Sequence, residues 1–144
     1  MAQIIEEFVT YLKATSGITS LVGSGSSARI WQQDGPREST TQSSLCVILQ
    51  SDESIDHLGG QSTLSRADVA VQCYAFSPTD RNTLAAAVRA AMPRDGSVTA
   101  MGSLAVTEIV TMSPRSDGDY VGAAGSDARL YFSNFVFRIW YYTA

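Results

Sequence analysis

Apolar and polar residues alternate between residues 66 and 76, and the period then changes. One parity of this stretch is wholly apolar, consisting of Ala67, Val69, Val71, Cys73 and Ala75. A period of two predicts a half-buried strand. From Ser77 onward the apolar residues recur at helical spacing, and Pro78 stands where proline favours a first helical turn. The stretch therefore predicts a strand that runs directly into an amphipathic helix, with Pro93 ending that helix.

A second amphipathic helix is predicted near the N-terminus, from about Ala2 to Ala14. Its apolar residues fall on one face at helical spacing, namely Ile4, Ile5, Phe8, Val9 and Leu12. The other face carries Glu6 and Glu7, whereas a helix that lies on a membrane usually has a basic polar face. We therefore expect this helix to pack on the core of the protein.

Four further stretches are predicted to be strands: residues 28–31, 45–50, 98–112 and 128–142. The polar segments around them are predicted to be loops or connections, with strand pairing that can continue some way along the second: residues 32–44, 51–63 and 113–127. Together these elements predict an α+β fold in a single domain of residues 1–144. Its sheet is expected to be mainly antiparallel and four- to five-stranded, with two helices packed on one face.

The final predicted strand has apolar residues on both faces. One parity is expected to face the helices: Tyr131, Phe135, Phe137, Ile139 and Tyr141. The opposite parity is the candidate subunit contact: Val136, Arg138, Trp140 and Tyr142. Burying a Trp or Phe side chain contributes on the order of 2–3 kcal/mol, so a second subunit that covers this face would be stabilising. A sheet that curls closed on itself is the alternative.

The overall composition narrows the class of protein. The chain has 144 residues, of which 44% are apolar and 17% charged, and a net charge of −4, which is typical of a globular domain. No apolar run approaches the roughly 20 residues that span a bilayer. The acidic total argues against a sequence-reading nucleic-acid binder. Cys46 and Cys73 are expected to be small buried side chains rather than a disulfide or metal pair.

The sequence offers little catalytic chemistry. His57 is the single histidine and follows Asp56, so a hydrolase with His57 as general base is one hypothesis, but no nucleophile motif accompanies it. The acidic pairs Asp52/Glu53 and Asp117/Asp119 resemble calcium ligands, but no EF-hand loop surrounds them. We therefore expect no enzyme activity and no catalytic, metal or cofactor site.

Several segments follow one another in a characteristic order. They are the N-terminal helix, a turn from Leu21 that leads to Arg29–Trp31, the strand at 45–50, the strand and helix from Arg66 to Ala91, and the aromatic run Phe137–Tyr141. In this combination, nearly the whole chain resembles the small tail-completion proteins of long-tailed bacteriophages, the tail terminator or tail-to-head joining group.

The resemblance implies a non-enzymatic structural protein of the virion. Such subunits form a ring, typically a hexamer, on the head-proximal end of the tail tube, where they stop tube polymerisation and join the tail to the head or neck. The implied partners are copies of the chain, the tail tube protein and the head–tail connector or neck proteins. DNA would pass through the lumen without specific binding, and no membrane is involved. The implied location is the tail–neck junction of the virion, after assembly in the host cytoplasm.

Residues in the predicted loops are the candidates for contact with these partners: Asp52, Glu53, Asp117, Asp119 and Tyr120. Three alternatives stay open. The chain could be another part of the same machine, such as a neck connector, a head-completion protein or a tail-tube subunit. It could be a hydrolase that uses His57. It could also be a small-ligand-binding domain, although no convergent polar pocket is evident in the sequence.

Overall fold

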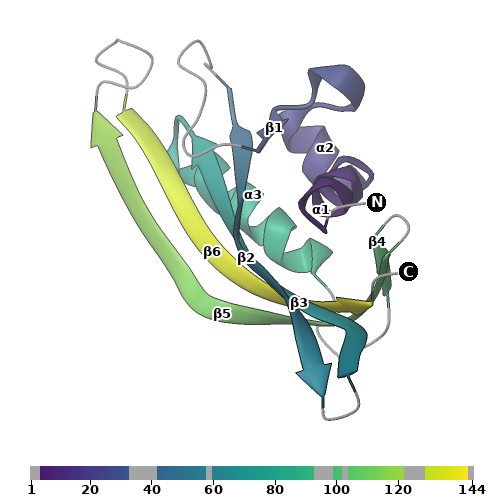
Figure 1. The fold of residues 1–144 in the computed structure, drawn as a ribbon. Coiled ribbons are helices and arrows are strands. Elements are labelled where there is room, and N and C mark those ends of the chain that lie inside the picture. The colour runs from purple at the N-terminus through teal and green to yellow at the C-terminus, as the bar shows by residue number, and fades with distance from the viewer. Residues whose placement is uncertain are drawn as a thin grey trace.

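The computed structural model describes residues 4–32, 42–57, 60–92, 99–101, 104–121 and 129–142. The chain begins with helices and ends with strands (Figure 1). In order, the elements are α1 (Ile4–Lys13), α2 (Ser16–Val22), the short 3-10 helix η1 (Gly25–Ser27), β1 (Ile30–Trp31), β2 (Ser44–His57), β3 (Gly60–Ala75), α3 (Pro78–Ala91), β4 (Thr99–Met101), β5 (Leu104–Val121) and β6 (Arg129–Tyr142).

The six strands form one sheet in the order β1-β2-β3-β6-β5-β4. Neighbouring strands are antiparallel, except that β1 runs parallel to β2. The predicted fold class is therefore wrong. Within the described residues the sheet has six strands and is mixed, and three α-helices accompany it rather than two. The parallel pair escaped prediction because the two residues of β1 are too few to show a period.

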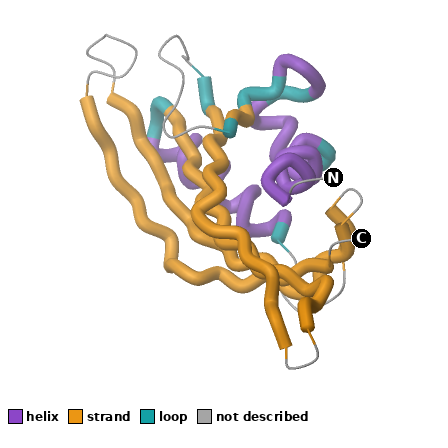
Figure 2. The backbone as a smooth tube through the Cα atoms, in the orientation of Figure 1, coloured by secondary structure: helices purple, strands orange, loops and turns teal. Residues whose placement is uncertain are grey.

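The sheet curls around the helices. Figures 1 and 2 show α1, α2 and α3 on the concave side, while β5 and β6 bend along their length. The pairing of β5 with β6 is interrupted by register shifts after Val106, Thr111 and Ser113. Such bulges bend a strand and increase its twist. We call the side that faces the helices the inner face and the convex side the outer face.

The two predicted amphipathic helices are present. The apolar stripe of α1 is buried, with Phe8 and Leu12 fully enclosed. At the start of α3, the Ser77 side chain accepts a hydrogen bond of 3.1 Å from the backbone N–H of Asp80, and Pro78 occupies the first turn. This cap satisfies a backbone donor that the helix cannot satisfy itself.

The core lies between the helices and the inner face. Alternate residues of β6 are buried there, as the sequence pattern predicted: Phe135, Phe137, Ile139 and Tyr141. The buried parity of β3 lies beside them, with Val69 opposite Phe137 and Val71 opposite Phe135. Tyr11 of α1 donates a hydrogen bond to the carbonyl of Ala91, which ties α1 to the end of α3.

Strands extend through the segment predicted as a connection with possible strand pairing, residues 51–63, and into the segment predicted as a loop, residues 113–127. β2 continues to His57, and β5 continues through Pro114 and Gly118 to Val121. Proline is tolerated in β5 because residues 114 and 115 lie in a bulge outside the ladder with β6. Polar composition was a poor guide here, since an edge strand with one face in water needs few apolar residues.

Cys46 and Cys73 are both free and fully buried. Cys73 belongs to the core under the helices, whereas Cys46 belongs to a separate cluster with Tyr74 and Leu130. The two thiols therefore lie on opposite faces of the sheet, and a disulfide between them would require the backbone to move. Burial raises the pKa of the Cys73 thiol, so it stays protonated.

Candidate interaction surface

The outer face carries the four residues predicted as subunit contacts. On β6, Val136, Arg138 and Trp140 alternate with the buried core residues and are half-buried, and Tyr142 is 44% exposed. No helix among the described residues covers this face (Figure 1). The structure thus places these four side chains together on one surface, and their role as subunit contacts remains a prediction.

Arg138 is held by a carboxylate of the neighbouring strand. Its Nε donates to Oδ1 of Asp68 at 2.8 Å, and a terminal nitrogen donates to Oδ2 at 3.1 Å. This two-point contact is the geometry in which a guanidinium and a carboxylate bind most specifically. The hydrogen bond from Arg138 lowers the pKa of Asp68 below its ordinary value. Arg138 therefore cross-links β3 and β6 across the outer face.

Trp140 lies in a row that crosses four strands. Arg66 of β3 and Glu108 of β5 stand opposite Trp140 on either side. The Arg66 guanidinium lies over the indole, 5.6 Å from the ring centroid, and also forms an ion pair with Glu53 of β2. A cation over an aromatic face is attracted by the ring quadrupole. The chain itself thus shields part of Trp140, more than the sequence pattern indicated.

The exposed large apolar side chains lie mostly on β5 rather than on β6. Among the described residues, three large apolar side chains are exposed: Val110, Met112 and Tyr142. Val110 stands opposite Arg138 on the outer face. Val110 and Met112 were not among the predicted contact residues, because the residues of the strand predicted at 98–112 were not assigned to faces of the sheet. Their exposure could have been predicted from Pro114, which follows shortly after them, because proline within a strand suggests that the strand lies at a sheet edge.

A second apolar cluster lies on the outer face, away from Trp140. Phe132 of β6 packs there with Tyr74, with ring centroids 6.3 Å apart. Its ring also covers Gly118, the residue opposite it on β5. A methyl group added at Gly118 would stand 2.4 Å from Cζ of Phe132. Glycine therefore lets the aromatic ring lie directly on the backbone of β5.

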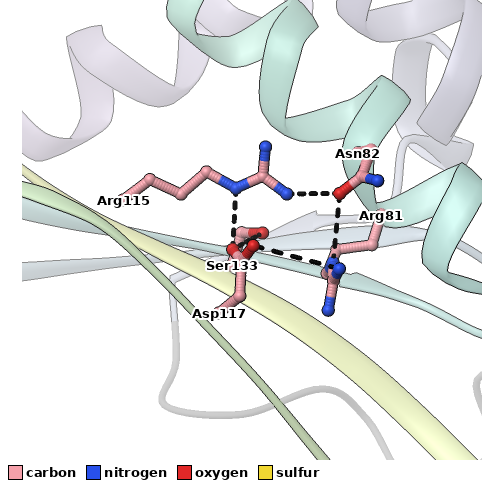
Figure 3. Close-up of polar contacts among 5 residues, drawn as sticks. All are labelled: Arg81, Asn82, Arg115, Asp117 and Ser133. Carbon is pink, nitrogen blue, oxygen red and sulfur yellow. Dashed lines mark hydrogen bonds and ion pairs between the residues drawn. The ribbon is translucent and has the colours of Figure 1, made fainter.

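A polar cluster joins the start of α3 to β5 and β6 (Figure 3). Nε of Arg115 donates to Oδ1 of Asp117 at 2.7 Å, and a terminal nitrogen of Arg115 donates to the Asn82 side chain. Ser133 donates to Asp117, and Arg81 lies 3.9 Å from its other oxygen. Burial acts to raise the pKa of Asp117, but the hydrogen bonds from Arg115 and Ser133 hold it below its ordinary value. The cluster fixes the distal half of β5 to α3.

The acidic residues predicted as partner contacts lie in strands rather than loops. Asp52 accepts a hydrogen bond from the buried Tyr141 hydroxyl, and Glu53 pairs with Arg66. Asp117 belongs to the polar cluster, and Asp119 lies 3.4 Å from Arg129. Tyr120 is part of β5. The structure brings Asp117 and Asp119 to β5 and Asp52 and Glu53 to β2, so it does not gather them into one site.

The hydrolase hypothesis falls on His57 and Asp56, whose side chains lie outside the described part of the structure. Both residues lie at the end of β2, where His57 stands opposite Gly60 of β3. No group of three or more His, Cys, Asp or Glu side chains within the described residues could hold a metal ion. In the same residues, no helix has the length and apolar content needed to cross a bilayer.

Within the part of the chain that the structure describes, both edges of the sheet are partly open. β4 pairs only with residues 104–106 of β5, so within the described chain residues 107–121 have no strand partner other than β6. A groove of about 330 Å³ follows this edge between β5 and the end of α3, lined by Arg89, Met92, Glu108, Ile109, Val110, Thr111 and Phe137. On the opposite edge, β1 covers only Leu45 and Cys46 of β2.

The fold has a counterpart among solved structures. A chain described as "Virion of native gene transfer agent (GTA) particle" matches with a TM-score of 0.62, over 99% of this chain and 100% of that chain, at 14% sequence identity. No protein-family model matches the sequence, and the search of curated proteins found no match. The likeness to the gene transfer agent chain is one of fold, and it extends over the full length of both chains.

Proposed function

We propose that this chain is a structural subunit of a phage-like virion that closes the head-proximal end of the tail tube as a ring and joins the tail to the head or neck. The observation that carries the proposal is the full-length likeness in fold to a chain of a gene transfer agent virion. The order of sequence segments, which resembles the tail terminator group, supports the same assignment independently.

The open sheet also supports a role in assembly. Two of the exposed large apolar residues, Val110 and Met112, lie on the edge strand β5. A long strand edge with unpaired backbone groups invites pairing with another chain. The acids that a catalytic site would need, Asp52, Glu53 and Asp117, are instead engaged with Tyr141, Arg66 and Arg115.

The charge of the chain fits a ring around DNA. A net charge of −4 per subunit multiplies with the number of copies in a ring. Like charge discourages adhesion of the DNA backbone. A lumen built from such subunits would let DNA slide through without specific binding.

The proposal is tested by mixing the purified protein with tail tubes assembled from the tube protein of the same particle. Electron micrographs should show a ring at one end of each tube, and tubes capped in this way should stop growing when more tube protein is added. Solution mass should show whether the ring exists before it meets the tube. Incorporation along the tube would instead identify a tube subunit, and binding to the neck alone would identify a connector.

A further inference from the structure

The open edge of β5 contains one regular run. Glu108, Ile109, Val110 and Thr111 pair one-to-one with residues 140 to 137 of β6, with a bulge on either side. All four of these β5 residues line the groove beside α3. A strand edge next to a groove is the arrangement that accepts an added strand, since the edge offers backbone hydrogen bonds and the groove accommodates side chains.

The open edge of β2 contains a matching run. Residues 51 to 54 pair one-to-one with residues 68 to 65 of β3, again with a register shift on either side. Ser51, Asp52, Glu53 and Ser54 are all exposed. Each edge of the sheet therefore presents a short, regular and solvent-accessible stretch of strand between two irregular ones.

The two runs lie at the same level of the sheet. One row crosses it from Ser51 through Asp68 and Arg138 to Val110. The next row on the same face runs from Glu53 to Glu108. Because β2, β3, β6 and β5 alternate in direction, β5 is antiparallel to β2. A second copy placed beside the first in the same orientation would thus continue the antiparallel order without sliding along the strands.

We infer that the open edge of β5 in one copy pairs with the open edge of β2 in the next copy. The occupant of the β5 groove is a second copy because the chain itself carries a complementary edge at the matching level and in the matching direction. Such a head-to-tail contact uses two different surfaces, and it closes into a ring when the rotation between copies divides a full turn. The inference deepens the proposed function, and it rests on that function for the ring.

Charge along this interface yields a specific expectation. Pairing at the same level places Glu108 of one copy beside Glu53 of the next, and like charges opposite each other in a sheet weaken pairing. The Arg66 guanidinium, which already binds Glu53, reduces this repulsion. A Glu108→Gln variant should therefore assemble at a lower protein concentration than the unaltered chain.

Cysteine cross-linking between copies tests the pairing. Val110→Cys and Ser51→Cys are made in separate chains, mixed, and treated with a short bis-maleimide, both free in solution and on capped tubes. Cys46 and Cys73 are buried and do not compete while the chain is folded. The control mixture pairs Ser51→Cys with Ala86→Cys, because Ala86 is an exposed residue of α3 that does not line the groove.

The expected result is a cross-linked dimer in the mixture of Val110→Cys and Ser51→Cys, at least about ten-fold above the control and above either variant alone. Equal cross-linking of Val110→Cys with itself would show a two-fold contact and overturn the inference. Capped tubes without the mixed cross-link would overturn the inference and leave the proposed function standing. Mixed cross-links in a protein that never caps tubes would support the strand pairing and contradict the proposed function.

Discussion

Replacing Gly118 by alanine tests the close contact between β5 and β6. Gly118 stands opposite Phe132, and an added Cβ would lie 2.4, 2.9 and 3.0 Å from three ring carbons of Phe132. Carbon atoms attract each other best at about 3.5–4.0 Å. The ring must therefore move by roughly 1 Å or more, away from a place where it packs with Tyr74 and Leu130.

Two opposing terms decide the sign of the effect. Alanine in a strand is favoured over glycine by roughly 0.5–1 kcal/mol, because glycine loses more conformational freedom on folding. Forcing an extra carbon into a packed site costs about 1–3 kcal/mol. Because the clash is with a ring confined by its neighbours, we expect the second term to dominate. Gly118→Ala should reduce the free energy of unfolding by about 1–2 kcal/mol.

Urea denaturation followed by circular dichroism measures this change. Gly17→Ala is the matched control, since Gly17 lies in α2 and an added Cβ meets nothing within 4 Å. The control should be neutral or stabilising by up to about 1 kcal/mol. In a Phe132→Ala background, Gly118→Ala should no longer destabilise. A stabilised Gly118→Ala chain, or an equal loss in both backgrounds, would refute the packing argument.

Three further outcomes are expected. Trp140→Glu should leave a folded subunit, because Trp140 is half-buried. The variant should assemble more weakly, as measured by its mass in solution. Loss of the circular dichroism signal would instead place Trp140 in the monomer core. Because Arg138 lowers the pKa of Asp68, their ion pair should stabilise the fold above the ordinary carboxyl pKa of about 3.9 and be lost as the pH falls below it. Asp68→Asn should therefore be less stable at neutral pH and lose less stability on acidification in urea titrations. Cys46 and Cys73 should react with a colorimetric thiol reagent only at the rate of unfolding, and fast labelling in native buffer would contradict their burial.

Residue periodicity predicted the elements that pack on both sides of the core. Helices α1 and α3, the cap at Ser77 and the buried parity of β6 all follow from spacing, because each element buries one continuous stripe. The same reasoning placed Trp140 on the face away from the helices. These features depend on the spacing of residues within one element, so they can be predicted from the sequence alone.

The extent and order of the strands needed more than local pattern. The second half of β5 has a proline, a glycine and several acids, and it became a strand because its partner β6 is long and apolar. The pairing of Arg138 with Asp68 joins residues far apart in the chain. Nothing in the spacing of either strand fixes that register until the sheet order is known. The level match between the open runs of β2 and β5 likewise cannot be predicted from local spacing, because it depends on the order and register of the strands between them.

The most regular ladder of the sheet sets how the chain can fold. Twelve consecutive pairs join residues 64–75 of β3 to residues 131–142 of β6 without a bulge. These segments lie far apart in sequence, with α3, β4 and β5 between them, so the ladder cannot grow from a tight turn. Long-range pairing of this kind slows folding to roughly milliseconds or seconds. β2 and β3 follow each other in the chain and can pair early. The sheet is completed only when β6, the last strand, pairs with β3.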